Sequence, residues 1–374
     1  MNKKSLKKII ISSGGTGGHF YPGLSIARQF KADGGDVLLL LSGINGQKQC
    51  QIAESFGINA ISLPKMPSPN SIKNIPYFIW GLAVGFIISI VKMLSYKPNA
   101  VIGMGAFTQA PILLAAFFLR KKIFLHDGNV RIGKANRYFS KIALFLGAGF
   151  PPDNGDKIAC PIENVGMPVR LEIEKYANIS KEEAISKLNE MFNLDFDFNS
   201  PVILITGGSQ GAQIFNEIIP QALANLQMLD LQVLHLAGKG KTQSALDIYK
   251  NVPFRYCVLE ETANMELFYG AADFAICRSG GGTLSELAIF KVASLLIPYP
   301  YAAELHQDAN ADYFVANNAA IKLDNDQLDA NKVYEVLQQL FEDESKLNQM
   351  RSNAATLAAP QAAKAFLSAI ESKI

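Results

Sequence analysis

The chain has 374 residues, 49% hydrophobic and 18% charged, which is enough apolar material for two well-filled cores and too little charge for a disordered chain. Its 35 lysine and arginine residues nearly balance 33 acidic residues, so we expect no nucleic-acid partner. The four cysteines lie far apart without a Cys-x-x-Cys pair, which argues against a zinc site or a disulfide framework. The apolar run after the basic start is too short for a signal peptide and predicts a cytoplasmic protein.

Short β-branched runs alternate with helical stretches along the whole chain. In the first half we expect buried strands at 9–13, 36–42, 100–103 and 122–126. In the second half we expect them at 201–206, 231–237, 256–259, 274–277 and 294–298. Continuous apolar strands separated by helices are typical of parallel sheets covered on both faces, so the fold class is predicted to be α/β.

A glycine-rich loop follows the first predicted strand of each half. The residues Gly14–His19 read GGTGGH, and Gly207–Ala212 read GGSQGA. This echo predicts two Rossmann-like domains in tandem, joined near residues 161–170. The last stretch, from Ala359 on, reads as a helix that can pack on either domain.

The segment from Ile75 to Val91 contains 17 residues and no charge, and the lysines that flank it are Lys65, Lys73, Lys92 and Lys97. A true membrane span here would separate the two parts of one α/β domain, which is untenable. Two alternatives stay open. The segment is a buried core helix, or it is a helix with one face in a bilayer, where the only tryptophan, Trp80, and the side chains of Phe78, Ile79 and Phe86 meet lipid.

The glycine loops suit an anion rather than a dinucleotide. Phe20 stands where the dinucleotide fingerprint needs its third glycine, and no acidic residue follows the second strand. A glycine turn that opens a helix still presents free N–H groups and the positive end of the helix dipole to phosphate. In the second loop, Ser209 adds a hydroxyl group that can donate to a phosphate oxygen.

A third loop of this kind runs from Arg278 through three glycines into a predicted helix. Thr283 and Ser285 stand where they can bind phosphate at the helix start. Glu286, one turn further on, would be repelled by a diphosphate and suits the hydroxyl groups of a ribose. Together the three loops predict a phosphorylated ligand at the carboxyl ends of the strands.

In this order and spacing, the three motifs closely resemble the MurG family, the peptidoglycan enzymes that move N-acetylglucosamine from a UDP donor to lipid I. The resemblance runs from residue 8 to about residue 370. It implies the GT-B fold, two Rossmann-like domains facing a central cleft. It places an acceptor and membrane-side domain at 1–165, with the last helix (about 359–374) packed back onto it, and a UDP-sugar donor domain at 166–358.

The resemblance also implies roles for individual residues. Thr16, Gly17 and Gly18 would line the donor side of the first loop, and Asn129 would touch the donor sugar. Arg170 would pair with phosphate or uracil, Ser209 would bind the donor, and Thr262 would bind uracil through backbone atoms. The α-phosphate and ribose would be held by Gly281, Gly282, Thr283, Leu284, Ser285 and Glu286, and the sugar hydroxyl groups by Gln307.

The chain departs from the family pattern mainly on the acceptor side and in the linker. Asp127 and Gly128 replace a glutamate and a glutamine, Phe107 replaces a tyrosine, and Met167 replaces an asparagine. The departures put details of acceptor binding in question more than donor binding.

We therefore expect a peripheral enzyme at the cytoplasmic face of the membrane that joins UDP-N-acetylglucosamine and lipid I by a single inverting displacement, without a metal or a cofactor. His19, whose ordinary pKa suits neutral pH, is the favoured general base, and Asp127 is the second candidate. A UDP-sugar epimerase of the same architecture and an inert nucleotide-sugar binding protein remain as alternatives.

Overall fold

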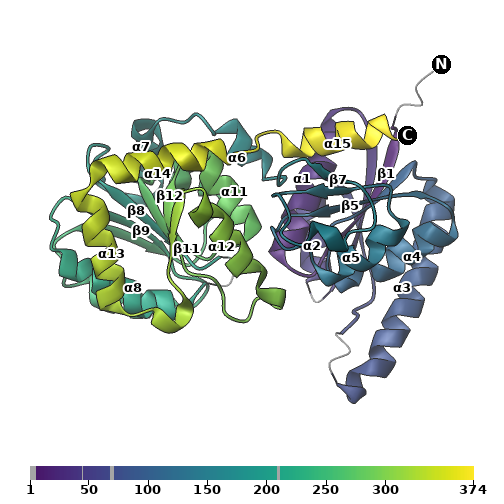
Figure 1. Ribbon diagram of the computed structural model, residues 1–374, viewed down its shortest axis with the longest axis horizontal. Helices are drawn as coiled ribbons and strands as arrows, with labels where there is room; N and C mark the ends of the chain where they lie inside the picture. Colours follow the sequence, from purple (N-terminus) through teal and green to yellow (C-terminus); the bar gives the residue numbers. More distant parts are fainter. Residues whose placement is uncertain (1–5, 44, 68–70, 209–210) are drawn as a thin grey trace. The chain divides into compact units, whose positions relative to one another are not determined.

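The computed structural model describes residues 6–43, 45–67, 71–208 and 211–374 (Figure 1). The chain divides into two compact units. Unit 1 comprises residues 1–170 together with 360–374, and unit 2 comprises residues 171–359. Arg170 is thus the last residue of unit 1 before the chain enters unit 2.

Within its described residues, unit 1 contains a seven-stranded parallel sheet in the order β3-β2-β1-β4-β5-β6-β7. All four strands predicted for the first half are present within a residue of the expected bounds. The three further strands have only three or four residues each, too few for a periodic signal. The strands are β1 (Lys8–Gly14), β2 (Asp36–Ser42), β3 (Asn59–Ser62), β4 (Ala100–Gly103), β5 (Lys122–Asp127), β6 (Leu146–Ala148) and β7 (Ile162–Asn164).

The principal helices of unit 1 follow its strands. They are α1 (Gly17–Ala32), α2 (Gly46–Ser55), α3 (Ile75–Tyr96), α4 (Ala110–Phe118), α5 (Lys134–Phe139) and α15 (Ala362–Ser372).

The chain's last helix, α15, packs against α1 in unit 1 (Figure 1). Its Phe366 is fully buried and meets the rings of Phe145 and His126 edge-on, with centroids 5.7 and 5.3 Å away. Burial lowers the pKa of His126, whose Nε2–H donates to the carbonyl oxygen of Gly166 at 3.0 Å. His126 is therefore a neutral structural residue of this core.

Unit 2 contains a six-stranded parallel sheet in the order β10-β9-β8-β11-β12-β13, counted over its described residues. The five predicted strands are present, and the short β13 is additional. The strands are β8 (Val202–Thr206), β9 (Gln232–Leu236), β10 (Arg255–Leu259), β11 (Phe274–Cys277), β12 (Ala293–Leu296) and β13 (Ala320–Lys322). The helices are α6 (Leu171–Lys175), α7 (Lys181–Phe192), α8 (Gln213–Leu226), α9 (Thr242–Tyr249), α10 (Met265–Ala271), α11 (Gly281–Ile289), α12 (His306–Ala316), α13 (Ala330–Glu342) and α14 (Glu344–Thr356).

Helix α3 has two different faces. Gly81, Gly85 and Ser89 recur every four residues and are buried, and Gly85 lies so close to Pro111 of α4 that an added Cβ would be 3.2 Å from it. On the opposite side Trp80, Ile87, Val91 and Leu94 are 56–60% exposed. With the turn before it, the helix spans Ile72–Tyr96, is long and apolar enough to cross a membrane, and has only 22% of its most apolar stretch buried.

The wholly buried alternative for this segment is therefore wrong. The individual side chains expected to meet lipid divide between the faces. Ile79 is 57% exposed, whereas Phe86 is half-buried, packs on the core of unit 1 and meets Phe118 of α4 at 6.2 Å.

Candidate functional site

In unit 1 the strand order reverses between β1 and β4, the place where open α/β sheets bind ligands at their carboxyl ends. The first glycine loop leaves β1 at this point. Gly14 has φ +118°, and an added Cβ would lie 2.5 Å from the carbonyl oxygen of Ser42, so only glycine fits. The chain then enters α1, with Thr16 and Gly18 exposed and Gly17 half-buried.

The side chain of His19 is held in one orientation by the loop after β4. Its Nδ1 lies 2.9 Å from the carbonyl oxygen of Met104. A carbonyl only accepts, so Nδ1 carries the proton, and the lone pair of the neutral ring lies on Nε2. Gly105, at φ +97°, passes so close that an added Cβ would be 3.0 Å from the ring. The ring of His19 is thus held through Nδ1, and its role as the general base stays a prediction.

Asp127, at the end of β5, is 4% exposed and accepts four hydrogen bonds from the loop that follows it and from the start of α5. Its Oδ1 accepts from the backbone N–H and the side-chain amide of Asn129, both at 3.2 Å. Its Oδ2 accepts from the backbone N–H of Gly133 and from Asn136 Nδ2, both at 3.0 Å. These bonds give Asp127 an organising role in the loop.

Two buried residues that the sequence reasoning missed join this loop to the loop that holds His19. Gln109 Oε1 accepts from the N–H of Gly105 at 2.9 Å, and Gln109 Nε2 donates to Asn136 Oδ1 at 2.8 Å. Asn136 donates in turn to Asp127 and to the carbonyl oxygen of His126. Neither residue belongs to a motif or a spacing that would have singled it out in the sequence.

Two departures from the family pattern fit one another in the structure. Met167 is buried, and an added Cβ on Gly128 would lie 2.3 Å from the Met167 sulfur atom. The larger side chain at 167 therefore occupies the space left open above the glycine at 128. Phe107, the third departure, is 41% exposed beside the Met104–Gly105 turn.

In unit 2 the two glycine loops leave the neighbouring strands β8 and β11, so α8 and α11 begin at the same edge of the sheet. Helix geometry leaves the first amides of α11, those of Gly281, Gly282 and Thr283, without acceptors inside the helix. An added Cβ on Gly280 or Gly208 would meet nothing within 4 Å, so there is open space beside these two glycines. The predicted Ser209 lies outside the described residues.

Glu286 lies in the second turn of α11, half-buried. Its Oε2 accepts a hydrogen bond at 2.8 Å from the hydroxyl group of Tyr269, which is 2% exposed. The bond fixes the carboxylate in one direction, which suits recognition of a pair of hydroxyl groups.

Other polar residues of unit 2 build the loops themselves. Gln307 Oε1 accepts from the backbone N–H of Tyr299 at 2.9 Å, and the Gln307 carbonyl oxygen accepts from Ser279 at 2.8 Å. Arg278 Nη1 donates to the carbonyl oxygens of Ile297 and Pro298, and the guanidinium lies over the Phe215 ring at 4.6 Å. Burial lowers the pKa of Arg278 from its ordinary value. Arg278 therefore acts as a scaffold for the third loop.

Comparison with known proteins decides the family. The glycosyltransferase family 28 N-terminal domain matches residues 9–145, and the family 28 C-terminal domain matches residues 202–366. The chain belongs to glycosyltransferase family 28. It is therefore a glycosyltransferase, and its two units are the domain pair of this family, as the GT-B prediction requires.

One relative of this family 28 chain comes from Francisella tularensis subsp. holarctica and is named UDP-N-acetylglucosamine–N-acetylmuramyl-(pentapeptide) pyrophosphoryl-undecaprenol N-acetylglucosamine transferase. It is 32% identical over 357 residues, which are 93% of this chain and 92% of the relative. The resemblance read from the three loop motifs is confirmed by this match.

Solved structures agree on the fold. The crystal structure of Acinetobacter baumannii MurG superposes with a TM-score of 0.78 at 24% identity, covering 98% of this chain and 100% of that one. A UDP-GlcNAc 2-epimerase from Neisseria meningitidis bound to UDP-GlcNAc has a TM-score of 0.68 at 14% identity, covering 97% and 99%. The fold alone is thus shared with the epimerases, whereas the sequence match favours the transferase.

The remaining predicted residues of the family 28 chain lie as follows. Thr262 follows β10, and its hydroxyl group accepts from the N–H of Asn264 at 3.1 Å. Asn129 and His19 both belong to unit 1, and Gln109 and Asn136 connect the loop of Asn129 to the loop that holds the ring of His19. The half-buried Arg170 also belongs to unit 1. Their contacts with substrate stay predictions.

Proposed function

We propose that this chain moves N-acetylglucosamine from UDP-GlcNAc to the 4-hydroxyl group of the muramoyl sugar in undecaprenyl-pyrophosphoryl-MurNAc-pentapeptide, or lipid I, and so forms lipid II. The observation that carries the proposal is the 32% identity, over 93% of the chain, to a relative named for this transfer. The orientation of His19 supports it, because the acceptor must lose a proton as it reacts.

In the proposed reaction unit 2 holds the donor. The amides at the start of α11 and the positive end of its dipole face the diphosphate and stabilise the negative charge that UDP gains as it leaves. Glu286, held by Tyr269, accepts from the ribose hydroxyl groups. Thr283, Ser285 and Gln307 complete donor binding, as the resemblance implies.

The acceptor oxygen attacks the anomeric carbon from the face opposite UDP. One C–O bond forms, the bond from the anomeric carbon to the UDP oxygen breaks with its electron pair, and the configuration inverts. The acceptor proton passes to Nε2 of His19, whose Nδ1–H stays on the Met104 carbonyl oxygen. Asp127, whose four hydrogen bonds come from the loop after β5 and the start of α5, acts as a positioning residue for this region rather than as the base.

The proposed site of action is the membrane surface, because the acceptor carries a polyprenyl chain. The exposed face of α3 offers Trp80, Ile87, Val91 and Leu94, and α4 adds the exposed Phe117 and Phe118. Exposed lysines stand before and after the helix at Lys73 and Lys97. Such lysines favour anionic lipid by about 1 kcal/mol each near the surface.

The transfer is tested with radiolabelled UDP-GlcNAc and a short-chain analogue of lipid I. We expect label in the acceptor and release of one UDP per transfer, both dependent on the acceptor. Conversion of UDP-GlcNAc to an epimer in the absence of acceptor would instead establish the epimerase alternative. Binding of UDP-GlcNAc without either reaction would establish the inert binding protein.

Membrane binding is tested by co-sedimentation with phosphatidylglycerol vesicles. The triple variant Trp80→Ser, Ile87→Ser, Val91→Ser should lose co-sedimentation while it keeps turnover on the short-chain acceptor, because these side chains face outward. The matched control is Phe198→Ser with Leu229→Ser, two exposed apolar residues of unit 2. Unchanged co-sedimentation of the triple variant would place the membrane face elsewhere.

A further inference from the structure

A cavity lies in unit 2, at the opposite edge of the sheet from the glycine loops. It has a volume of about 240 Å³ and is lined by the residue before β11, Asp273, and by the residues after α11, Phe290 and Lys291. The proposed phosphate-binding amides stand at the other end of α11, about 13 Å away along the nine-residue helix. The cavity is therefore distinct from the donor site.

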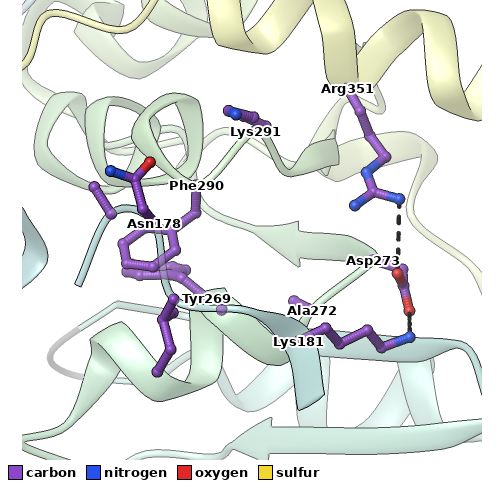
Figure 2. Close-up of a pocket in the computed structure, with 11 residues that line it drawn as sticks. Asn178, Lys181, Tyr269, Ala272, Asp273, Phe290, Lys291 and Arg351 are labelled. Carbon is purple, nitrogen blue, oxygen red and sulfur yellow. Dashed lines mark hydrogen bonds and ion pairs between the residues drawn. The ribbon is translucent and has the colours of Figure 1, made fainter. Parts of the chain in front are cut away.

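The lining of this cavity carries an excess of positive charge. Lys181, Lys291 and Arg351 are its cations, and Asp273 is its only acidic residue. Figure 2 shows Lys181 and Arg351 both reaching Asp273, with nitrogen–oxygen distances of 2.5 and 3.7 Å. The Asp273 carboxylate also accepts from the backbone N–H of Val202 at 2.9 Å.

The three cations differ in the hydrogen bonds and ion pairs that they make with other residues of the protein. Lys181 donates to Asp273 and to the carbonyl oxygen of Ser200, so its hydrogen bonds are internal. Arg351 is 38% exposed and beyond hydrogen-bond distance of Asp273, and Lys291 is exposed and has no ion pair among the residues that the structure describes. One carboxylate against three cations gives the lining a net charge of +2.

The rest of the lining contains aromatic and aliphatic side chains together with the polar Asn178. The rings of Tyr269 and Phe290 lie 5.7 Å apart at one side of the cavity (Figure 2), and Ile179 adds an aliphatic side chain. Ligand sites generally combine such walls with a few charged groups, and cavities for drug-sized ligands begin near 300 Å³. A cavity of this volume suits a smaller molecule with one compact, doubly charged anionic group.

We propose that this pocket binds a small phosphomonoester, with its dianionic phosphate between Arg351 and Lys291 and its organic part against Phe290 and Tyr269. The guanidinium group suits a phosphate because its planar donors pair with two oxygens at once. Because Tyr269 also donates to Glu286, the ligand would contact a residue that holds the proposed ribose-binding carboxylate.

The test is calorimetric titration of the full chain with phenyl phosphate, a dianion with an aromatic body. Wild-type protein should bind it at this pocket, and the double variant Lys291→Gln, Arg351→Gln should weaken that binding by roughly ten- to hundredfold. The matched control removes two cations elsewhere in unit 2, with Lys332→Gln and Arg255→Gln, and should bind as wild type does.

A variant at the start of α11 separates this pocket from the donor site. Thr283→Val should leave the binding of phenyl phosphate unchanged. The proposal is overturned if wild-type protein binds no phenyl phosphate, if the double variant binds as tightly as wild type, or if the binding disappears in Thr283→Val. Thermal unfolding of each variant verifies that it is folded.

Discussion

The carboxyl ends of the two sheets are built in different ways. In unit 1, buried side chains bond to one another, from Asp127 through Asn136 and Gln109 to the loop that holds His19. In unit 2, the first amides of α11 have no acceptors inside the helix, and Glu286 accepts a hydrogen bond from the hydroxyl group of Tyr269. The first design fixes the orientation of the proposed base, His19, in advance, whereas the second leaves backbone amides without acceptors inside the helix.

The sharpest test of this contrast is His19→Ala in unit 1. A general base contributes about 10²–10⁴-fold to the rate, so kcat should fall by that factor with little change in UDP affinity. Steady-state kinetics with the short-chain acceptor and calorimetry with UDP measure the two quantities. Near-wild-type turnover would show that another group accepts the proton, and Asp127→Asn is the next variant to measure.

In unit 2 the corresponding change is Glu286→Ala. Loss of a hydrogen bond to a charged group costs about 1.5–3 kcal/mol, so UDP affinity should fall roughly ten- to hundredfold while acceptor affinity stays the same. Tyr269→Phe, which keeps the carboxylate but removes the hydroxyl group that holds it, should give a smaller loss in the same direction. An unchanged UDP affinity in Glu286→Ala would contradict the assignment of this residue to the ribose.

The stability of unit 2 should depend on pH through a buried histidine away from the site. Burial lowers the pKa of His235 to about 3, and its ring contacts Tyr249 and Asn216. The unfolded chain binds a proton below about pH 6.5 that the folded chain does not, so stability is full above that pH and falls by about 1.4 kcal/mol per pH unit below it. The free energy of unfolding, measured with urea at pH 7 and pH 5, should show this dependence on pH. The variant His235→Gln should remove it. Equal slopes in both proteins would refute the prediction.

The smallest expected effect is on the stability of unit 1, through one residue with a strained backbone conformation in the loop after β4. Ala106 has φ +60° and ψ 155°, a region almost restricted to glycine, and lies between Gly105 and Phe107 in the loop that holds His19. Ala106→Gly should therefore raise the free energy of unfolding by about 1 kcal/mol, measured by urea denaturation. A loss of stability would show that the backbone at 106 is not strained.

The sequence was sufficient for the strands that are long and apolar, because four or more buried residues in a row leave a clear pattern. It was not sufficient for β3, β6, β7 or β13, which have three or four residues each. The glycine loops and Glu286 could be found because a phosphate at a helix start requires particular residues at fixed spacing.

The network in unit 1 could not be found in this way. Gln109 and Asn136 are 27 positions apart, and their bond exists only because β4 and β5 are neighbours in the sheet. The same holds for Met167 over Gly128, a packing relation that spacing does not reveal. From the sequence alone it was also ambiguous which face of α3 is buried. Glycine or serine at every fourth position indicates a buried face only when the neighbouring helix, α4, is known to pack there.

The position of α15 has a consequence for how the protein is made on the ribosome. Phe366 completes the packing around Phe145 and His126, yet it is translated after all of unit 2. At roughly 5–20 residues per second, residues 171–359 take on the order of 10–40 s to synthesise. During that interval the apolar surface of unit 1 that α15 will cover is exposed. The amino-terminal unit therefore finishes folding last. An mRNA truncated before the codon for Phe366 yields a chain whose exposed apolar surface chaperones and proteases can recognise.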